Sequence, residues 1–322
     1  MNAVVVASNR PEYLELFLEK WSTELRKVKV YVILDLPEKR DFNFHGLDVS
    51  LFCWADIDAD LGEVSWVIPR YTSGIKSYGI LKAWQNGAGM IACLDDDCFP
   101  DTPRYIERHW ENLKRNVHPD WHSTLDVPPN RYPRGFPYEI RGKFRTVGIS
   151  HGLWSNIPDY DAVTASRYGK DRTALYDPPR VEVVPVDNFF PMCGMNVAFR
   201  REIAPVMYFG LQGKEYPYDR FDDIWCGLFA KKILDHLGYS VTNGGPYIRH
   251  ERASEVSKNL VKEQPGMAVN ERLWKAVKTL KLRQATPGAC LVECADALPS
   301  GEYWRKLRQA MRIWVSLFDN ED

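Results

Sequence analysis

The chain has 322 residues, of which 45% are hydrophobic and 26% charged, a composition that supports a packed core and excludes long disordered tracts. Its formal net charge is −1, whereas nucleic-acid-binding proteins usually carry a basic excess, so no nucleic-acid partner is expected. The N-terminal apolar run is too short for a signal peptide, and no run approaches the roughly 20 apolar residues of a membrane span. We interpret the seven scattered cysteines as reduced thiols and expect a cytoplasmic protein.

Short apolar runs alternate with helical patterns in the first third of the chain. Buried strands are predicted over residues 3–7, 28–34, 90–94 and, approximately, 49–53. Helices are predicted from Pro11 onward and over residues 71–84, because apolar side chains recur there at helical spacing. Strands that alternate with helices indicate an α/β fold with a mainly parallel sheet, in which ligands bind at the carboxyl ends of the strands.

The pattern dissolves between residue 118 and about residue 185, where Pro, Gly, Tyr, Arg and Asp are frequent. We expect long functional loops and short strands packed on the core there, because disordered segments rarely carry so many aromatic residues. Order returns at residues 189–199, and helices are predicted over 221–237, which Gly238 ends, and over 302–318. A linker-like stretch at 281–288 suggests a catalytic domain over residues 1–265, with the loop insertion near 118–185, and a C-terminal helical extension over 266–322.

Three aspartates, Asp95, Asp96 and Asp97, directly follow the buried strand at 90–94, and Asp35 follows the strand at 28–34. Crowded carboxylates at a partly solvated strand end repel each other, and a divalent cation is the usual remedy. Carboxylate oxygens suit Mg²⁺ or Mn²⁺, and a metal that bridges a diphosphate would stabilise the leaving group when a sugar–diphosphate bond breaks. The alternative is a solvated acidic turn, which the preceding buried strand disfavours.

Other candidate residues lie further along the chain. Asp222 and Asp223 open a predicted helix, where acids favour the helix dipole; they could also orient sugar hydroxyls or stabilise positive charge at the anomeric carbon. His250 ends a strand-like segment, and it is either structural or an additional metal ligand. Arginines of a Pro/Gly/Tyr-rich loop could clamp phosphates or pair with surface acids. These arginines are Arg131, Arg134, Arg141 and Arg145.

Several segments together resemble the reversibly glycosylated polypeptides, a family that includes the plant UDP-arabinopyranose mutases. The most specific are SHGLWSNIPDYDA at 150–162 and FFPMCGMNVAF at 189–199. Further matches are LDDDCF at 94–99, MYFGL at 207–211 and DDIWCG at 222–227. The similarity runs in order over roughly residues 1–263.

The resemblance implies a GT-A-type glycosyltransferase fold with helices on both faces of the sheet, a divalent metal, usually Mn²⁺, and a UDP-sugar substrate. The aspartate triplet is needed for activity in the family, and Arg10 and Lys76 match two of its basic positions. The expected metal ligands are Asp95, Asp97 and His250. The residues expected to bind the UDP-sugar are Arg10, Asp35, Lys76, Asp95 and Asp96.

The family also carries a segment in which an arginine becomes reversibly glycosylated, and RGFPYEIR at 134–141 matches it. The resemblance therefore implies that Arg134 carries the sugar and that Arg141 supports it, with Asp222 and Asp223 as further catalytic candidates. The implied activity is interconversion of UDP-arabinopyranose and UDP-arabinofuranose through cleavage, ring opening and recapture of the sugar. The alternatives are a glycosyltransferase that uses an external acceptor and a non-catalytic assembly subunit. Family members often assemble, so we expect a homo- or hetero-oligomer.

Overall fold

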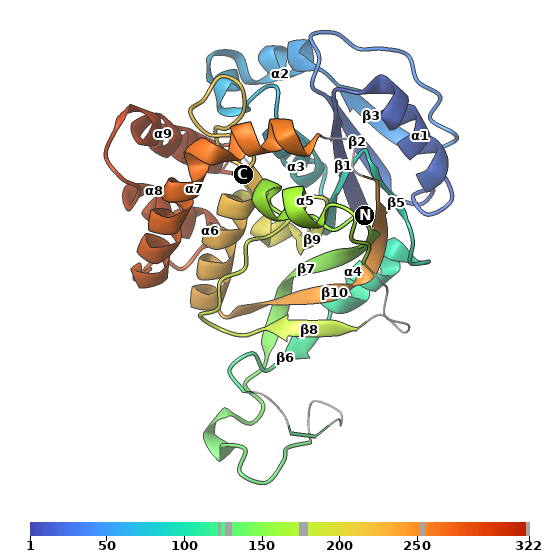
Figure 1. The fold of residues 1–322 in the computed structure, drawn as a ribbon. Helices are drawn as coiled ribbons and strands as arrows, with labels where there is room; N and C mark the ends of the chain where they lie inside the picture. The colour runs from blue at the N-terminus through green and yellow to red at the C-terminus, as the bar shows by residue number, and fades with distance from the viewer. Residues whose placement is uncertain (122–123, 126–130, 174–179, 252–254, 320–322) are drawn as a thin grey trace.

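A computed structural model shows a ten-stranded sheet with helices on both of its faces (Figure 1). The structure describes residues 1–121, 124–125, 131–173, 180–251 and 255–319. The strands are β1 (Asn2–Ser8), β2 (Lys29–Leu34), β3 (Asp48–Phe52), β4 (Met90–Asp95), β5 (Cys98–Pro100), β6 (Asn116–Val117), β7 (Arg145–Asn156), β8 (Val181–Val184), β9 (Asn196–Arg200) and β10 (Tyr239–His250). Their order in the sheet is β3-β2-β1-β4-β9-β7-β10-β5, while β6 pairs with β7 and β8 with β10.

Helices connect and cover these strands. The α-helices are α1 (Pro11–Trp21), α2 (Trp54–Leu61), α3 (Lys76–Gln85), α4 (Tyr105–Leu113), α5 (Ala162–Tyr168), α6 (Asp222–Leu237), α7 (Val256–Thr279), α8 (Pro287–Asp296) and α9 (Glu302–Ser316). Short 3₁₀ helices are η1 (Gly62–Val67), η2 (Ser73–Ile75), η3 (Tyr138–Ile140) and η4 (Arg201–Val206).

The direction of the strands decides which residues share an edge. Strands β3, β2, β1 and β4 run parallel, and β10 runs parallel to β7. Strand β9 is antiparallel to both β4 and β7, so β4 and β7 point the same way. The predicted α/β fold with a largely parallel sheet is thus confirmed. The carboxyl ends of β1, β2, β4, β7 and β10 form one edge, called the carboxyl edge below.

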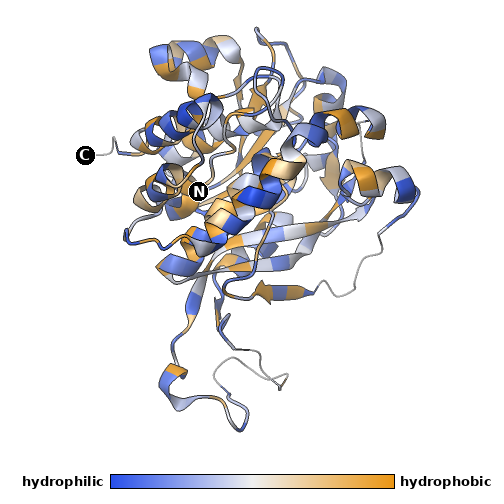
Figure 2. Ribbon diagram, turned by 60° about the vertical axis from the view of Figure 1, so that its left-hand side comes forward, coloured by the Kyte–Doolittle hydropathy of each residue, from blue (hydrophilic) through white to orange (hydrophobic). Residues whose placement is uncertain are grey.

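Both faces of the sheet are buried, which follows from the side-chain alternation along each strand. In β1, Val5 belongs to one hydrophobic cluster, whereas Val4 and Val6 belong to the other. Helices α3, α6, α8 and α9 contribute to the first cluster, and α1 and α4 to the second. Figure 2 shows the apolar residues concentrated in the strands and on one side of the helices.

The C-terminal helices do not stand apart from this core. Apolar side chains of α8 and α9 lie in the same cluster as the strands, and Trp314 donates from Nε1 to the carbonyl of Pro205 at 2.9 Å. Helix α7 runs across residue 265, and the division of the chain near that residue stays a prediction. No helix in the described ranges has the length and apolar character needed to cross a membrane. The seven cysteines are buried and free, including Cys290 and Cys294 on α8.

The expected loop region 118–185 contains a long central strand that the sequence pattern concealed. Strand β7 has 12 residues and lies between β9 and β10, so the prediction of only loops and short strands was wrong there. Gly148 and Gly152 interrupt its apolar pattern because neighbouring side chains occupy the space of a Cβ, including the buried amide of Asn196 beside Gly152. Residues 122–123, 126–130 and 174–179 of this region lie outside the described ranges.

Two predicted elements begin later than expected. The helix predicted over 71–84 starts at Lys76, since Tyr71 has a positive φ of 59° and residues Ser73–Ile75 form a 3₁₀ turn. The order predicted at 189–199 is a strand only from Asn196. Before Asn196, the backbone N–H groups of Cys193 and Gly194 donate hydrogen bonds to the side chains of His151 and Asp223 instead of to a neighbouring strand.

A buried polar cluster fixes β9 against β7 and α4. Asn196 donates to the carbonyls of Leu153 at 2.8 Å and Pro246 at 3.0 Å, and its Oδ1 accepts from the hydroxyl of Tyr105 and from Nε2 of His109. Burial lowers the pKa of His109 to about 3, so the ring is neutral. Every polar atom of the Asn196 side chain therefore has a partner, as a buried amide requires.

We predict that Gly152→Ala lowers the free energy of unfolding by about 3 kcal/mol, because the new methyl group displaces the Asn196 amide from this cluster. Chemical denaturation of the purified variant measures the change. Gly89→Ala is the matched control, since its Cβ would meet only the carbonyl of Met1 at an ordinary 3.8 Å. Equal stability of the two variants would contradict the assignment.

Candidate active site

The aspartate triplet lies at the carboxyl edge, in the turn between β4 and β5. Asp95 is the last residue of β4, and β5 begins at Cys98, so Asp96 and Asp97 form the turn itself. Asp96 is 3% exposed and Asp97 9%, while the side chain of Asp95 is 34% exposed. The turn thus holds two nearly buried carboxylates beside one that solvent reaches, and the charges must be compensated locally.

Two residues at the carboxyl end of β1 compensate Asp96. The hydroxyl of Ser8 donates to its Oδ2 at 2.5 Å, and Arg10 donates to the same carboxylate from Nε at 3.2 Å and from Nη2. Nη2 of Arg10 also lies 3.4 Å from Oδ2 of Asp97. Burial raises the pKa of Asp96, although Arg10 and Ser8 act in the opposite direction. Arg10 therefore adjoins the triplet, where the sequence places it.

Lys76 compensates Asp95 from the start of α3. Its side chain is 2% exposed and forms an ion pair with Asp95, and Nζ donates to the carbonyl of Gly194 at 3.1 Å. Burial by itself would raise the pKa of Asp95, but Lys76 outweighs it and lowers that pKa. Breaking such a buried pair by removing one partner typically costs about 3–5 kcal/mol.

Gly194 connects this ion pair to the first turn of α6. Its carbonyl accepts from Lys76, and its N–H donates to Oδ2 of Asp223 at 2.8 Å. The neighbouring Asp222 accepts from the hydroxyls of Thr72, at 3.0 Å, and Ser73. The structure therefore brings the two helix-opening acids to the same edge as the triplet. Gly194 was not among the predicted site residues, although it lies within the segment FFPMCGMNVAF that the resemblance singled out.

Asp223 titrates in an unusual range. Burial and the charges of Asp222, Asp159 and Asp95 raise its pKa to about 7. A carboxyl group with this pKa exchanges a proton readily at neutral pH, so Asp223 is suited to general acid and base catalysis.

Asp35 lies at the carboxyl end of β2 and faces aromatic neighbours. Its Oδ1 accepts from Nε1 of Trp54 and from the backbone N–H of Tyr71, both at 2.9 Å, and burial raises its pKa. The rings of Trp54 and Tyr71 meet edge to face at 4.9 Å. Strand β1 separates β2 from β4, so Asp35 and Asp95 are two strands apart, about 10 Å across the sheet.

His250 ends β10 beside the triplet. It pairs in register with Cys98, and the next residue, Glu251, donates its N–H to the carbonyl of Asp97 at 2.9 Å. Nδ1 of His250 lies 2.8 Å from the carbonyl oxygen of Ile157, and because a carbonyl only accepts, Nδ1 carries the proton. In the neutral ring Nε2 then has the lone pair, the arrangement that metal-binding histidines commonly use.

Arg134 and Arg141 lie far from these residues. Both belong to the loop before β7, which joins that strand at its amino end, opposite the carboxyl edge. The guanidinium of Arg141 stacks 3.7 Å from the ring centroid of Tyr138 and 5.0 Å from that of Tyr132, and Arg134 is exposed. The structure therefore does not bring Arg134 or Arg141 to the aspartate triplet within one chain.

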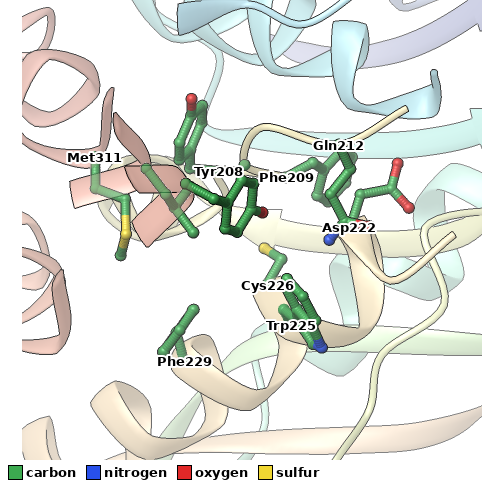
Figure 3. A pocket seen from close by; sticks show the side chains of 11 residues that line it. Tyr208, Phe209, Gln212, Asp222, Trp225, Cys226, Phe229 and Met311 are labelled. Carbon is green, nitrogen blue, oxygen red and sulfur yellow. The ribbon is translucent and has the colours of Figure 1, made fainter. Parts of the chain in front are cut away.

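A small apolar recess borders the site on the side of the C-terminal helices (Figure 3). Aromatic and aliphatic side chains of α6, α9 and the segment 207–212 line it, and its residues include Asp222 but none of the triplet. The Asp222 side chain is directed away from Phe229 and Met311. The recess is thus a mainly apolar space beside Asp222, and the other charged groups of the site do not line it.

The raised pKa of Asp223 predicts a change in stability with pH. Between about pH 4 and pH 7 the folded chain binds a proton at Asp223 that the unfolded chain has lost, so this group makes the protein less stable as the pH rises. Relative to Asp223→Asn, the wild type should lose at least about 1 kcal/mol over this range. Denaturation at several pH values measures the difference, and parallel curves for the two proteins would refute the raised pKa.

Comparison with known proteins places these residues in a family. The model of the family described as "Reversibly glycosylated polypeptide" matches residues 2–322. UDP-arabinopyranose mutase 1 of Arabidopsis thaliana is 35% identical to this chain over 94% of the chain and 88% of its own length. UDP-arabinopyranose mutase 1 of Oryza sativa subsp. japonica is 33% identical over 94% and 87%, respectively. This chain therefore belongs to the reversibly glycosylated polypeptide family.

Proposed function

We propose that this chain is a UDP-arabinopyranose mutase, which interconverts UDP-arabinopyranose and UDP-arabinofuranose in the cytoplasm. The observation that carries the proposal is the connected group at the carboxyl edge, in which Gly194 joins the Lys76–Asp95 ion pair to Asp223. Cations for a diphosphate and an acid for proton transfer are thereby combined in a chain whose relatives carry that name.

The substrate would lie along the carboxyl edge. Asp35, with Trp54 and Tyr71, offers an acceptor and aromatic surface for the uridine, about 10 Å from Asp95. Arg10 and Lys76 would face the diphosphate, because both cations are already held beside the triplet. Asp222 and Asp223 would then lie near the sugar.

A divalent cation would be held by Asp95, Asp97 and His250. Carboxylate oxygens suit Mn²⁺ or Mg²⁺, and the hydrogen bond from Nδ1 of His250 supports the ring for metal binding. Among the described residues, no three His, Cys, Asp or Glu side chains lie close enough together to form a metal site by themselves. Oxygen atoms of the substrate diphosphate would therefore supply the remaining ligands of the cation. When bound, the metal would neutralise charge on the departing diphosphate.

The chemistry needs a nucleophile for the sugar and a group that moves one proton. The bond between C1 and the β-phosphate oxygen breaks, UDP leaves with the electron pair, and a guanidinium nitrogen of Arg134 bonds to C1 and releases a proton. The ring oxygen O5 then leaves C1, and O4 attacks C1 in its place. Asp223 takes the proton of the 4-hydroxyl and returns it to O5, which its pKa of about 7 allows. Attack of UDP on C1 reverses the first step, and Arg134 recovers its proton.

Purified protein with UDP-arabinopyranose should form UDP-arabinofuranose without any added acceptor. Asp223→Asn should slow the reaction about 10²- to 10⁴-fold, because the amide cannot exchange the proton. Chromatographic separation of the pyranose and furanose forms measures the rate. The exposed Asp41→Asn is the control and should keep the wild-type rate. Consumption of the UDP-sugar only when an acceptor is supplied would favour a glycosyltransferase instead.

Removal of the metal should abolish the interconversion. In excess chelator the diphosphate would lose its counter-charge, and Mn²⁺ or Mg²⁺ added back should restore the rate. Asp97→Asn should raise the metal concentration needed for half-maximal activity at least tenfold, and a metal titration of both proteins measures this. Full activity in chelator would refute the metal and leave charge compensation to Arg10 and Lys76.

A further inference from the structure

The segment 131–144, called the arm, projects from the body of the molecule. It lies between β6 and β7, and in both Figure 1 and Figure 2 it extends below these strands, at the end of the molecule away from the C-terminal helices. The arm contains Arg134 and Arg141, which the resemblance to the family connects with the sugar.

The strand register gives the separation of the arm from the triplet. Ile149 of β7 and Ile91 of β4 both pair with Phe199 of β9, so they lie at the same level of the sheet. Arg145 precedes Ile149 by four residues, and Asp95 follows Ile91 by four. At about 3.3 Å per residue, the base of the arm and Asp95 are roughly 26 Å apart along the strands.

The arm is folded in this position. His118 packs on Phe144 with centroids 4.2 Å apart and on Phe136 at 5.3 Å, and Tyr132 packs on Phe136 at 4.7 Å. The hydroxyl of Tyr132 accepts from the N–H of Gly142 at 2.9 Å. Movement of Arg134 to the carboxyl edge of its own chain would break this packing.

The base of the arm is also pinned. Arg145 pairs with Asp120 at 2.9 Å and donates from Nη1 to the carbonyl of Asp235 at the same distance. These contacts join the arm to the end of α6, so a hinge at Arg145 would disrupt them too.

The arm and the carboxyl edge are complementary in charge. The arm carries four cationic side chains and one acidic side chain, Glu139. The cationic residues are Arg131, Arg134, Arg141 and Lys143. At the carboxyl edge Asp159 is exposed, and Asp223, which is partly buried, has no salt-bridge partner within the described residues. Tyr138, which is 81% exposed, and Trp121, which is 38% exposed and packs on Phe136, add aromatic surface to the arm.

We propose that the arm of one copy docks on the carboxyl edge of a second copy and presents Arg134 to the sugar bound there. The inference rests on the proposed function and adds to it that each site is completed by a neighbouring chain. We infer a second copy of this chain as the partner for two reasons. The edge that needs a nucleophile and the arm that supplies one belong to the same sequence, and in one folded chain they lie at opposite edges of the sheet.

Transfer between chains can be tested by mixing two variants that are inactive alone. The two variants carry tags of different size, so that the labelled chain can be identified. Arg134→Ala keeps the aspartate triplet but lacks the acceptor, while Asp97→Asn keeps Arg134 but is inactive at a metal concentration that saturates only the wild type, which is the concentration used for every sample. With radiolabelled UDP-arabinose, neither variant alone should take up label. In the mixture the Asp97→Asn chain should be labelled at least tenfold above its level alone. Arg26→Ala, at an exposed arginine in the segment before β2, should label like the wild type.

The outcomes separate this inference from the proposed function. If the wild type is labelled but the mixture is not, Arg134 acts within its own chain and the inference is overturned. If the wild type takes up no label, the sugar-carrying step of the proposed function is wrong. The docking of the arm is then tested by analytical sedimentation, which measures whether the copies assemble. Assembly that disappears when Arg134 and Tyr138 are both replaced by Ala supports docking through the arm. The docking proposal is refuted if the wild type remains monomeric, or if the double variant assembles to the same extent as the wild type.

Discussion

The buried ion pair between Lys76 and Asp95 is the interaction on which the arrangement of the site depends. Lys76 is 2% exposed and has two acceptors, the carboxylate of Asp95 and the carbonyl of Gly194. Desolvation of both charges is costly, so the pair persists only because its geometry and its extra hydrogen bond compensate that cost. Through Gly194 the same cation sets the position of Asp223, and it thereby ties the end of β4 to the start of α6.

This arrangement separates two kinds of carboxylate. Asp95 and Asp96 are held by cations, which makes their charges available to orient other groups without strong repulsion. Asp223 accepts from two backbone N–H groups, those of Gly194 and Ile224, but it is buried among acidic neighbours, so its pKa rises toward neutrality. Different surroundings thus prepare chemically identical side chains for binding and for proton transfer.

The distance between the arm and the carboxyl edge gives the fold a second organising feature. A rigid sheet separates a basic, aromatic projection from an acidic rim, and the same strands that support the rim hold the base of the arm. Because β7 is anchored on both sides by β9 and β10, neither end moves without the other. Association of copies would join complementary surfaces that a single chain cannot bring together.

The sequence by itself determined the α/β alternation, the burial of the strands and the position of the triplet after one of them, because side-chain period and β-branched runs are local properties. Long specific segments of the sequence also indicated the family, and the resemblance to that family implied that Arg134 carries the sugar. The tertiary structure alone decided that β7 is a central strand, since its Gly152 is explained by Asn196, a residue 44 positions further along the chain. It also decided that Lys76 pairs with Asp95, that Gly194 links them to Asp223, and that Arg134 lies at the opposite end of the sheet. These facts follow from the order and direction of strands, which local patterns do not encode, because hydrogen bonds between distant segments set them.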